Sequence, residues 1–108
     1  MLELYVMRHA KSSWEDINLE DYKRPLNKRG KKNAKMICEF FVKKKYYFDY
    51  ILVSSSKRTI KTLKILLKKI DKPKKIISSK KLYLTSEDKI INLIKKIPKK
   101  FKSVLLIN

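Results

Sequence analysis

Short, uninterrupted apolar segments alternate along this chain with longer segments of helical periodicity, and this alternation restricts the possible fold more than any other feature. The apolar segments are 2–7, 50–53, 76–77 and 103–107, and the helical segments run from about 28 to 45, 56 to 70 and 86 to 97. Strands that are apolar throughout and joined by helices are typical of a parallel sheet covered on both faces. We therefore expect residues 1–108 to form a single α/β domain with three layers, αβα, around a mainly parallel sheet.

Local signals set the ends of these elements. Asn27 and Ser86 precede the first and third helical segments and are residue types that cap helices. Pro73 and Pro98 follow the second and third helical segments, where proline stops helix growth. Segment 2–7 is predicted to be a buried strand, whereas the short segment 76–77 is expected near an edge of the sheet.

The chain is strongly basic, with 29 lysines and arginines against 10 acidic residues and a formal net charge of +19. Such an excess favours nucleic acid as a partner, because basic side chains neutralise backbone phosphates. Lysines occur in almost every segment, however, which indicates a bias in composition and argues against a specific nucleic-acid site. A retained arginine in such a chain suggests a place that needs a planar, bidentate guanidinium. The arginines are Arg8, Arg24, Arg29 and Arg58.

Other features bear on the cellular setting. No apolar run approaches the roughly 20 residues that a membrane span needs. The first residues lack the basic start and the small-residue cleavage site of a signal peptide. The only cysteine, Cys38, lies on the apolar stripe of the first helix, and it allows neither an internal disulfide nor a cysteine-based zinc site. We expect a soluble, cytoplasmic protein that does not act at a membrane.

Two polar segments follow directly on apolar strands. Arg8 and His9 come after the first strand, and residues 54–58 follow the second. Because ligands of parallel α/β folds bind beyond the carboxyl ends of the strands, we expect Arg8, His9 and Arg58 to meet there. His9 is the only histidine. An imidazole can act as a nucleophile toward phosphorus, and arginines can bind the phosphoryl oxygens bidentately.

Three blocks of the sequence carry a more specific pattern. They are residues 8–14 (RHAKSSW) together with 21–30 (DYKRPLNKRG), residues 49–62 (DYILVSSSKRTIKT), and residues 103–107 (SVLLI). In this order and spacing they resemble the SixA-like phosphohistidine phosphatases of the histidine phosphatase superfamily, which also includes cofactor-dependent phosphoglycerate mutases. The resemblance implies a metal-independent phosphatase without a cofactor. Its implied substrate is a phosphorylated protein carrying phosphohistidine, or a small phosphate ester.

The resemblance also implies a role for individual residues. His9 would accept the phosphoryl group as a covalent phosphohistidine, and Arg8 and Arg58 would clamp the phosphoryl oxygens. Arg24 would contribute to the rim of the same pocket, and Ser12 would donate a hydrogen bond. The sequence around Arg24 is equally compatible with a solvated loop charge.

The chain departs from the family pattern at its C-terminus. The family carries a second histidine directly after the strand that corresponds to 103–107, and this sequence ends at Asn108. We expect the chain to be the N-terminal portion of a histidine phosphatase domain that is incomplete at the C-terminus. We also expect it to be weak or inactive as a phosphatase, because losing one partner of a phosphoryl oxygen can cost about 10²–10³ in rate.

Two other functions remain open. The charge and the missing second histidine favour a non-catalytic basic module that binds phosphate or nucleic acid. A mutase acting on a phosphorylated sugar acid is disfavoured, because the chain lacks the insertions that give mutases their specificity. The aromatic residues 46–48 could stack on bases, but an aromatic cluster between a helix and a strand is more often part of the packing.

Overall fold

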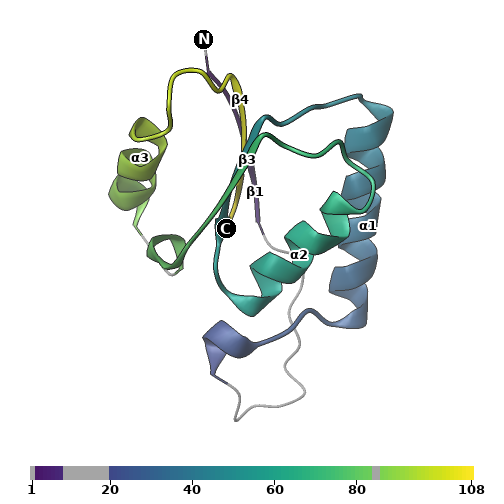
Figure 1. Ribbon diagram of the computed structural model, residues 1–108. Coiled ribbons are helices and arrows are strands. Elements are labelled where there is room, and N and C mark those ends of the chain that lie inside the picture. Colours follow the sequence, from purple (N-terminus) through teal and green to yellow (C-terminus); the bar gives the residue numbers. More distant parts are fainter. Residues whose placement is uncertain (1, 9–19, 84–85) are drawn as a thin grey trace.

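The computed structural model describes residues 2–8, 20–83 and 86–108. Strands and helices alternate along this part of the chain, as Figure 1 shows. In chain order they are β1 (Glu3–Met7), η1 (Asp21–Lys23), α1 (Lys28–Lys43), β2 (Tyr50–Ser54), α2 (Lys57–Leu67), β3 (Lys75–Ser79), η2 (Lys80–Leu82), α3 (Glu87–Lys95) and β4 (Ser103–Ile107). None of the helices in the described ranges is long and apolar enough to cross a membrane.

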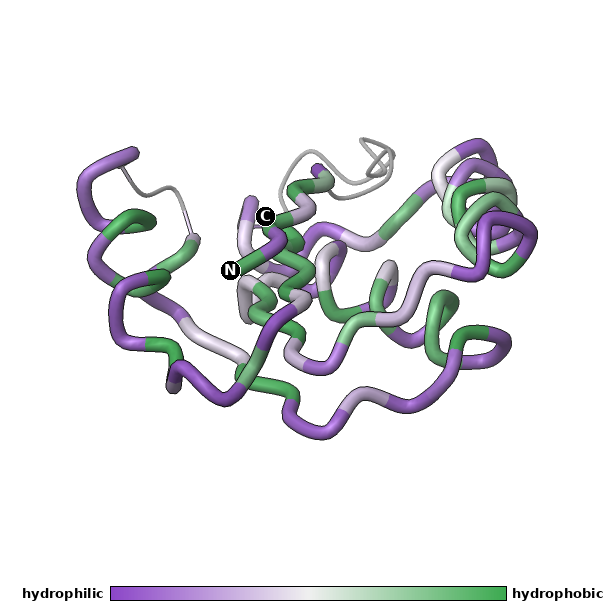
Figure 2. Tube along the Cα trace, turned by 90° about the horizontal axis from the view of Figure 1, so that it is seen from above, coloured by the Kyte–Doolittle hydropathy of each residue, from purple (hydrophilic) through white to green (hydrophobic). Residues whose placement is uncertain are grey.

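The four described strands form one parallel sheet in the order β1-β4-β2-β3. In Figure 2 the sheet stands between α3 on one side and α1 and α2 on the other. This arrangement confirms the predicted three-layer α/β fold with a parallel sheet. Its physical basis is the apolar character of the central strands β2 and β4, which are buried on both faces.

Alternate residues of the central strands enter two separate cores. Ile51, Val53 and Leu105 pack with α1 and α2 on one face. Leu52 and Leu106 point to the opposite face and pack in a second core with residues of η2 and the segment after α3. The alternation follows from the two-residue repeat of a strand, so a continuous apolar run supplies both cores at once.

The structure corrects the prediction that segment 2–7 is a buried strand. β1 lies at an edge of the sheet and pairs with β4 alone among the described strands. Tyr5 and Met7 pack against the core beneath α1 and α2. Leu4 and Val6 point to the other face, where they are 41% and 63% exposed. The apolar run identified a strand correctly. Which strands are covered depends on the strand order, and β4 rather than β1 lies inside the sheet.

β3 occupies the opposite edge, as predicted for segment 76–77, but it is a full five-residue strand. Its backbone pairs with β2 from Lys75 opposite Tyr50 to Ser79 opposite Ser54. The polar residues at both ends hid this length from the sequence pattern. Backbone pairing with a buried neighbour, rather than side-chain burial, maintains the outer residues of β3.

The predicted helix caps are confirmed. The side chain of Asn27 accepts a hydrogen bond from the backbone N–H of Gly30 (2.7 Å), and that of Ser86 accepts one from Lys89 (3.5 Å). These bonds satisfy N–H groups that have no partner within the first helical turn.

The helix α1 ends at Lys43, two residues earlier than predicted. The chain turns at Lys45, whose backbone is left-handed with φ of 58°. The N–H groups of Lys45 and Tyr46 then donate to the carbonyl oxygens of Val42 (3.1 Å) and Phe41 (3.0 Å). Glycine usually occupies such a position, since a side chain disfavours positive φ.

Candidate active site

The carboxyl ends of β1, β4 and β2 lie side by side at the lower edge of the sheet in Figure 1. Met7 pairs with Ile107, and Ile107 in turn pairs with Val53. The segments that follow β1 and β2 are therefore two strand spacings apart, about 10 Å. Arg8 is exposed at this edge. The backbone N–H of Asn108 donates to the Met7 carbonyl oxygen next to it (3.1 Å).

Two of the predicted site residues, His9 and Ser12, lie outside the described residues. Their predicted roles as nucleophile and hydrogen-bond donor stay predictions. Within residues 2–8, 20–83 and 86–108, no group of three or more His, Cys, Asp or Glu side chains is placed to hold a metal ion.

The start of α2 fixes the backbone that carries Arg58. The hydroxyl of Thr59 donates to the carbonyl oxygen of Ser54 (2.8 Å) and contacts the hydroxyl of Ser56. The hydroxyl of Thr62 donates to the carbonyl oxygen of Arg58 itself (2.8 Å). These buried side-chain contacts tie the first turn of α2 to the end of β2. As a result Arg58 leaves the helix in a defined direction, beside the carboxyl edge of the sheet.

Asp21 joins the two buried arginines of this region. Arg58 donates from Nη1 to the Asp21 carbonyl oxygen (2.7 Å) and from Nη2 to Oδ2 of its carboxylate (3.0 Å). Arg24 donates from Nη2 to Oδ1 of the same carboxylate, and the Tyr83 hydroxyl donates to Oδ2 (2.5 Å). We call Asp21, Arg24, Arg58 and Tyr83 the arginine cluster. A single carboxylate thus orients both guanidinium groups.

The hydrogen bonds in the arginine cluster determine its charge. Donation from Tyr83 and Arg24, followed by Arg58, holds the pKa of the Asp21 carboxyl well below its usual range. The same bond to Asp21 raises the pKa of the Tyr83 hydroxyl. Asp21 is therefore ionised and Tyr83 is a neutral donor at pH 7. Two guanidinium cations against one carboxylate leave the cluster positive, which suits an anionic ligand.

An aromatic pair supports the cluster on one side. The rings of Tyr22 and Tyr83 meet edge to face with centroids 4.9 Å apart. The Tyr22 hydroxyl is hydrogen-bonded to the hydroxyl of Ser55 (2.7 Å), and the guanidinium of Arg58 lies 5.8 Å from the centroid of the Tyr83 ring. These contacts connect η1, the end of β2 and the residue after η2. They form a wall between the cluster and the surface beside it.

The structure brings together two of the arginines selected from the sequence. Arg24 and Arg58 are only 5% and 8% exposed. Arg24 is therefore a buried, ion-paired residue rather than a solvated loop charge. Arg8 directly follows the last residue of β1, at the same edge of the sheet.

Sequence reasoning missed the roles of Asp21 and Tyr83 in this arrangement. The available signal was the spacing of Asp21 and Arg24, an acid three residues before a retained arginine in a chain poor in acids. Tyr83 gave no local signal, since it is 62 residues from its partner Asp21.

Comparison with known proteins places the chain in a family. The model of the histidine phosphatase superfamily (branch 1) matches residues 4–82. That range contains all but the first residue of β1, both buried arginines and Asp21. The chain belongs to the histidine phosphatase superfamily. Within it, the chain falls in the SixA-like branch, as the 26% identical structure described below indicates.

Two solved structures are close to this fold. The candidate phosphohistidine phosphatase SixA from Agrobacterium tumefaciens is 26% identical with a TM-score of 0.90, over 97% of this chain and 67% of that one. The protein histidine phosphatase SixA complexed with tungstate has a TM-score of 0.86 over the same shares of both chains. At 20% identity, this second likeness concerns the fold alone.

Curated relatives match over a shorter range. An uncharacterized chloroplastic protein of Arabidopsis thaliana is 37% identical over 68 residues, which are 63% of this chain and 31% of that protein. A 2,3-bisphosphoglycerate-dependent phosphoglycerate mutase of Buchnera aphidicola is 38% identical over 71 residues, 62% of this chain and 30% of the mutase. The chain thus spans under a third of the length of these relatives in the matched region.

Proposed function

We propose that this chain carries the nucleophile and the phosphate-binding arginines of a phosphatase that acts through a covalent phosphohistidine on His9. The observation that carries this proposal is the pair of buried arginines held by Asp21 beside the end of β2, at the same edge of the sheet as the end of β1. His9 follows Arg8 directly in the sequence. Membership of the superfamily supports the same class of reaction.

The proposed reaction has two balanced steps. An unprotonated ring nitrogen of His9 attacks phosphorus, and the bond from phosphorus to the leaving atom of the substrate breaks as that atom takes a proton from solvent water. Water then attacks the phosphohistidine, releasing inorganic phosphate and returning His9. Negative charge on the phosphoryl oxygens would be bound by Arg8, Arg24 and Arg58, with Ser12 as a further donor.

We propose phosphohistidine on a protein as the substrate, with small phosphate esters as the second class. A phosphohistidine carried by a protein requires an open site, and Arg8 is exposed at the edge of the sheet. The likeness to the candidate phosphohistidine phosphatase SixA, at 26% identity, supports the same substrate class. Neither proposed substrate requires the chain to bind a metal or a cofactor.

Covalent trapping tests the proposal directly. The chain is incubated with radiolabelled phosphoramidate, which contains the P–N bond of phosphohistidine, and then quenched in base, where phosphohistidine is stable. We expect label on the protein that acid removes, no label on His9→Ala, and about 10²-fold slower labelling of Arg58→Ala. Lys95→Ala, a change in an exposed residue of α3, serves as the control and should label normally. Equal labelling of His9→Ala and the unaltered chain would contradict the proposal.

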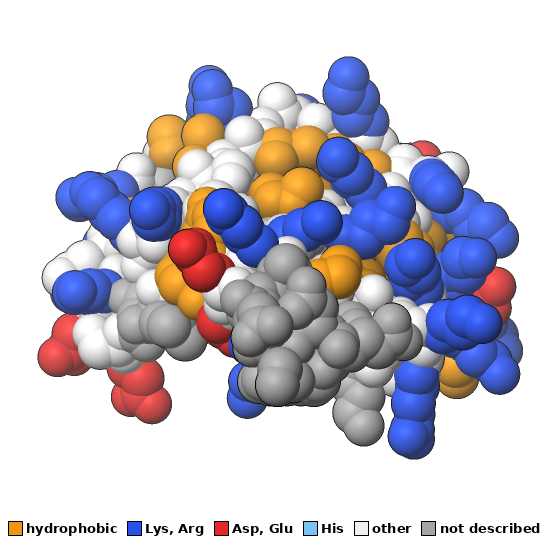
Figure 3. All heavy atoms as spheres, turned by 90° about the horizontal axis from the view of Figure 1, so that it is seen from below, with side chains coloured by type: hydrophobic (Ala, Val, Ile, Leu, Met, Phe, Trp, Pro, Cys, Tyr) orange, Lys and Arg blue, Asp and Glu red, His pale blue; other side chains and the backbone are white. Residues whose placement is uncertain are grey.

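A second candidate is a basic module that binds phosphate or nucleic acid without catalysis. Lysine and arginine side chains cover much of the carboxyl-end face, most densely on the side of α1 and α2 (Figure 3). This function predicts no covalent label at all. It also predicts that His9→Ala leaves the affinity for a DNA oligonucleotide unchanged, so the two functions are separable with one variant.

A further inference from the structure

A groove of about 470 Å³ opens between η1, α1 and α2, next to the arginine cluster. Five lysines line it, and none of the other described lining residues is acidic. We call it the lysine groove. Its lysines are Lys23, Lys31, Lys57, Lys61 and Lys64. Five ammonium groups around one depression repel each other, and an anionic occupant would relieve that repulsion.

The lining of the lysine groove is not purely polar. Pro25, Leu26 and Ile60 contribute apolar surface between the lysines. Leu26 is buried and packs with Ala34 and Ile65 in a small core between the two helices, so this part of the groove is rigid. A rigid apolar base with a cationic rim fits a segment that carries both apolar and acidic side chains.

The groove and the arginine cluster share a wall. Tyr22 and Ser55, whose hydroxyls are hydrogen-bonded at 2.7 Å, line the groove. On the other side the Tyr22 ring contacts Tyr83 of the cluster. Lys23 and Lys57 each precede a buried arginine, Arg24 and Arg58, by one residue. A ligand in the groove would therefore lie directly beside a phosphoryl group bound at the cluster.

We propose that the lysine groove binds an acidic, partly apolar segment of the phosphorylated protein whose phosphohistidine enters the adjacent site. This inference rests on the proposed function, and it names the surface that selects the partner. Nucleic acid fits the groove less well. A bound single strand is held in part by stacking of its bases on free aromatic faces. Tyr22, the aromatic residue of the groove, is held by Ser55 and Tyr83 and has the ammonium of Lys80 5.4 Å from its ring centroid.

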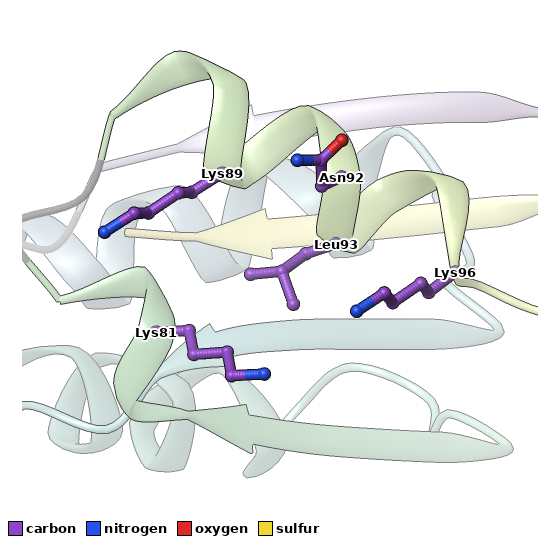
Figure 4. Close-up of a pocket in the computed structure, with 5 residues that line it drawn as sticks. All are labelled: Lys81, Lys89, Asn92, Leu93 and Lys96. Carbon is purple, nitrogen blue, oxygen red and sulfur yellow. The ribbon is translucent and has the colours of Figure 1, made fainter.

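Lysine is abundant throughout the chain, so the lysine groove is compared with a second lysine-lined cavity of the same molecule. A second cavity lies against α3, on the opposite side of the sheet, with Leu93 pointing into it between lysine side chains (Figure 4). It too has no acidic residue in its described lining. Its three lysines, Lys81, Lys89 and Lys96, form no part of the wall beside the arginine cluster. If the net charge of the chain alone attracted acidic partners, removing the same number of charges from either cavity would weaken binding equally.

The test compares two charge-matched variants of the full chain. Lys61→Glu/Lys64→Glu changes the groove, and Lys89→Glu/Lys96→Glu changes the cavity at α3. Each lowers the formal net charge from +19 by four, to +15. All four lysines are exposed, so the fold should be retained. The corresponding glutamine pairs serve as milder versions. The probe is a fluorescein-labelled peptide of glutamates interspersed with leucines, and its binding is followed by fluorescence anisotropy.

We expect the groove variant to weaken peptide binding about tenfold and the α3 variant to weaken it less than about threefold, because only the groove holds the peptide. The glutamine pairs should show the same order with smaller effects. Equal losses in the two variants would overturn the inference, since attraction would then depend on net charge alone. A groove variant that loses affinity for a DNA oligonucleotide but not for the peptide would overturn it in favour of nucleic acid.

A final measurement separates this inference from the proposed function. Covalent labelling by phosphoramidate should be unchanged in the groove variant, because the small donor does not contact the groove. Peptide binding should be unchanged in His9→Ala. If the unaltered chain is not labelled, the phosphatase proposal is refuted. If the groove variant and the α3 variant bind the peptide equally well, only the docking surface is refuted.

Discussion

Replacing Asp21 by asparagine removes one negative charge from the arginine cluster and leaves its shape almost unchanged. In the folded protein this carboxylate accepts hydrogen bonds from Arg24, Arg58 and Tyr83. The amide can accept through its single oxygen, while its NH₂ group faces another donor. The substitution therefore removes one negative charge that faces two nearly buried guanidinium groups.

The size of the effect follows from exposure. Hydrogen bonds to charged groups contribute about 1.5–3 kcal/mol each when they are well protected from water. The Asp21 side chain is 39% exposed, so solvent screens these interactions substantially. We expect Asp21→Asn to lower the free energy of unfolding by about 1–2 kcal/mol in total. Urea denaturation at pH 7 measures this difference, and the exposed Asp71→Asn is the control, with an expected change near zero.

The pH dependence gives the sharper test. The pKa of Asp21 is lowered in the folded state. The stabilisation that Asp21 gives the folded state is therefore complete above the pKa of aspartate in the unfolded chain, about 3.9. It is lost as the pH falls toward the lower folded pKa. The difference between the unaltered chain and Asp21→Asn should therefore be constant from pH 7 to about pH 5 and should narrow below about pH 4. A difference that is absent at pH 7, or that grows on acidification, would refute the assigned network.

The same variant separates orientation from charge in the reaction. Removing a negative charge strengthens the positive field and by itself favours an anionic ligand. Releasing Arg24 and Arg58 from their fixed orientation acts in the opposite direction on the transition state. We expect labelling by phosphoramidate to slow by about tenfold, while affinity for inorganic phosphate does not weaken. Faster labelling would show that Asp21 only lowers the potential and does not position the arginines.

Further substitutions test other parts of the structure. Tyr83→Phe removes one donor from Asp21 and should lower the free energy of unfolding by about 1 kcal/mol. Because it moves the folded pKa of Asp21 back toward the unfolded one, it should also reduce the stability that is lost below about pH 4, as urea denaturation across pH would show. Asp49→Ala removes a buried carboxylate that accepts hydrogen bonds from the backbone N–H groups of Lys102 (2.9 Å) and Ser103 (3.1 Å) at the start of β4. It should lower the free energy of unfolding by about 2–3 kcal/mol in urea denaturation, and a loss under about 0.5 kcal/mol would contradict the role of Asp49. Lys45→Gly places glycine at a left-handed position and should raise the free energy of unfolding by about 1 kcal/mol; thermal unfolding at a lower temperature would contradict this.

The fold was predictable because its determinants are local. A continuous apolar run of five residues marks a strand wherever it lies, and Asn27 and Ser86 mark helix starts through hydrogen bonds to residues three positions away. Strand order is not local. The last strand, β4, enters between β1 and β2, and for that reason β1 became an edge strand with exposed Leu4 and Val6. The sequence of β1 alone contains no signal for that placement.

The candidate site shows the same division. Arg24 and Arg58 could be selected because a chain that uses lysine for most positive charges keeps arginine where a planar fork is needed. Both prove to be buried on one carboxylate. The partners themselves could not be predicted, because Asp21 is 37 residues from Arg58 and 62 from Tyr83 in the sequence. Only the packing of η1 and η2 beside the start of α2 brings these side chains together.

The structure also divides the basic residues by the range over which they act. The buried arginines act by contact, with donor and acceptor about 3 Å apart, where a fixed orientation matters and salt has little effect. The exposed lysines act through the field, which salt screens beyond roughly 8 Å at physiological ionic strength. A carboxylate beside the lysines would only weaken that field, and none lines the lysine groove among the described residues. Beside the arginines a carboxylate is useful. Asp21 weakens the attraction for an anion but fixes the orientation of both guanidinium groups. Recognition of a partner and chemistry on its phosphoryl group can therefore depend on different cations of the same +19 chain.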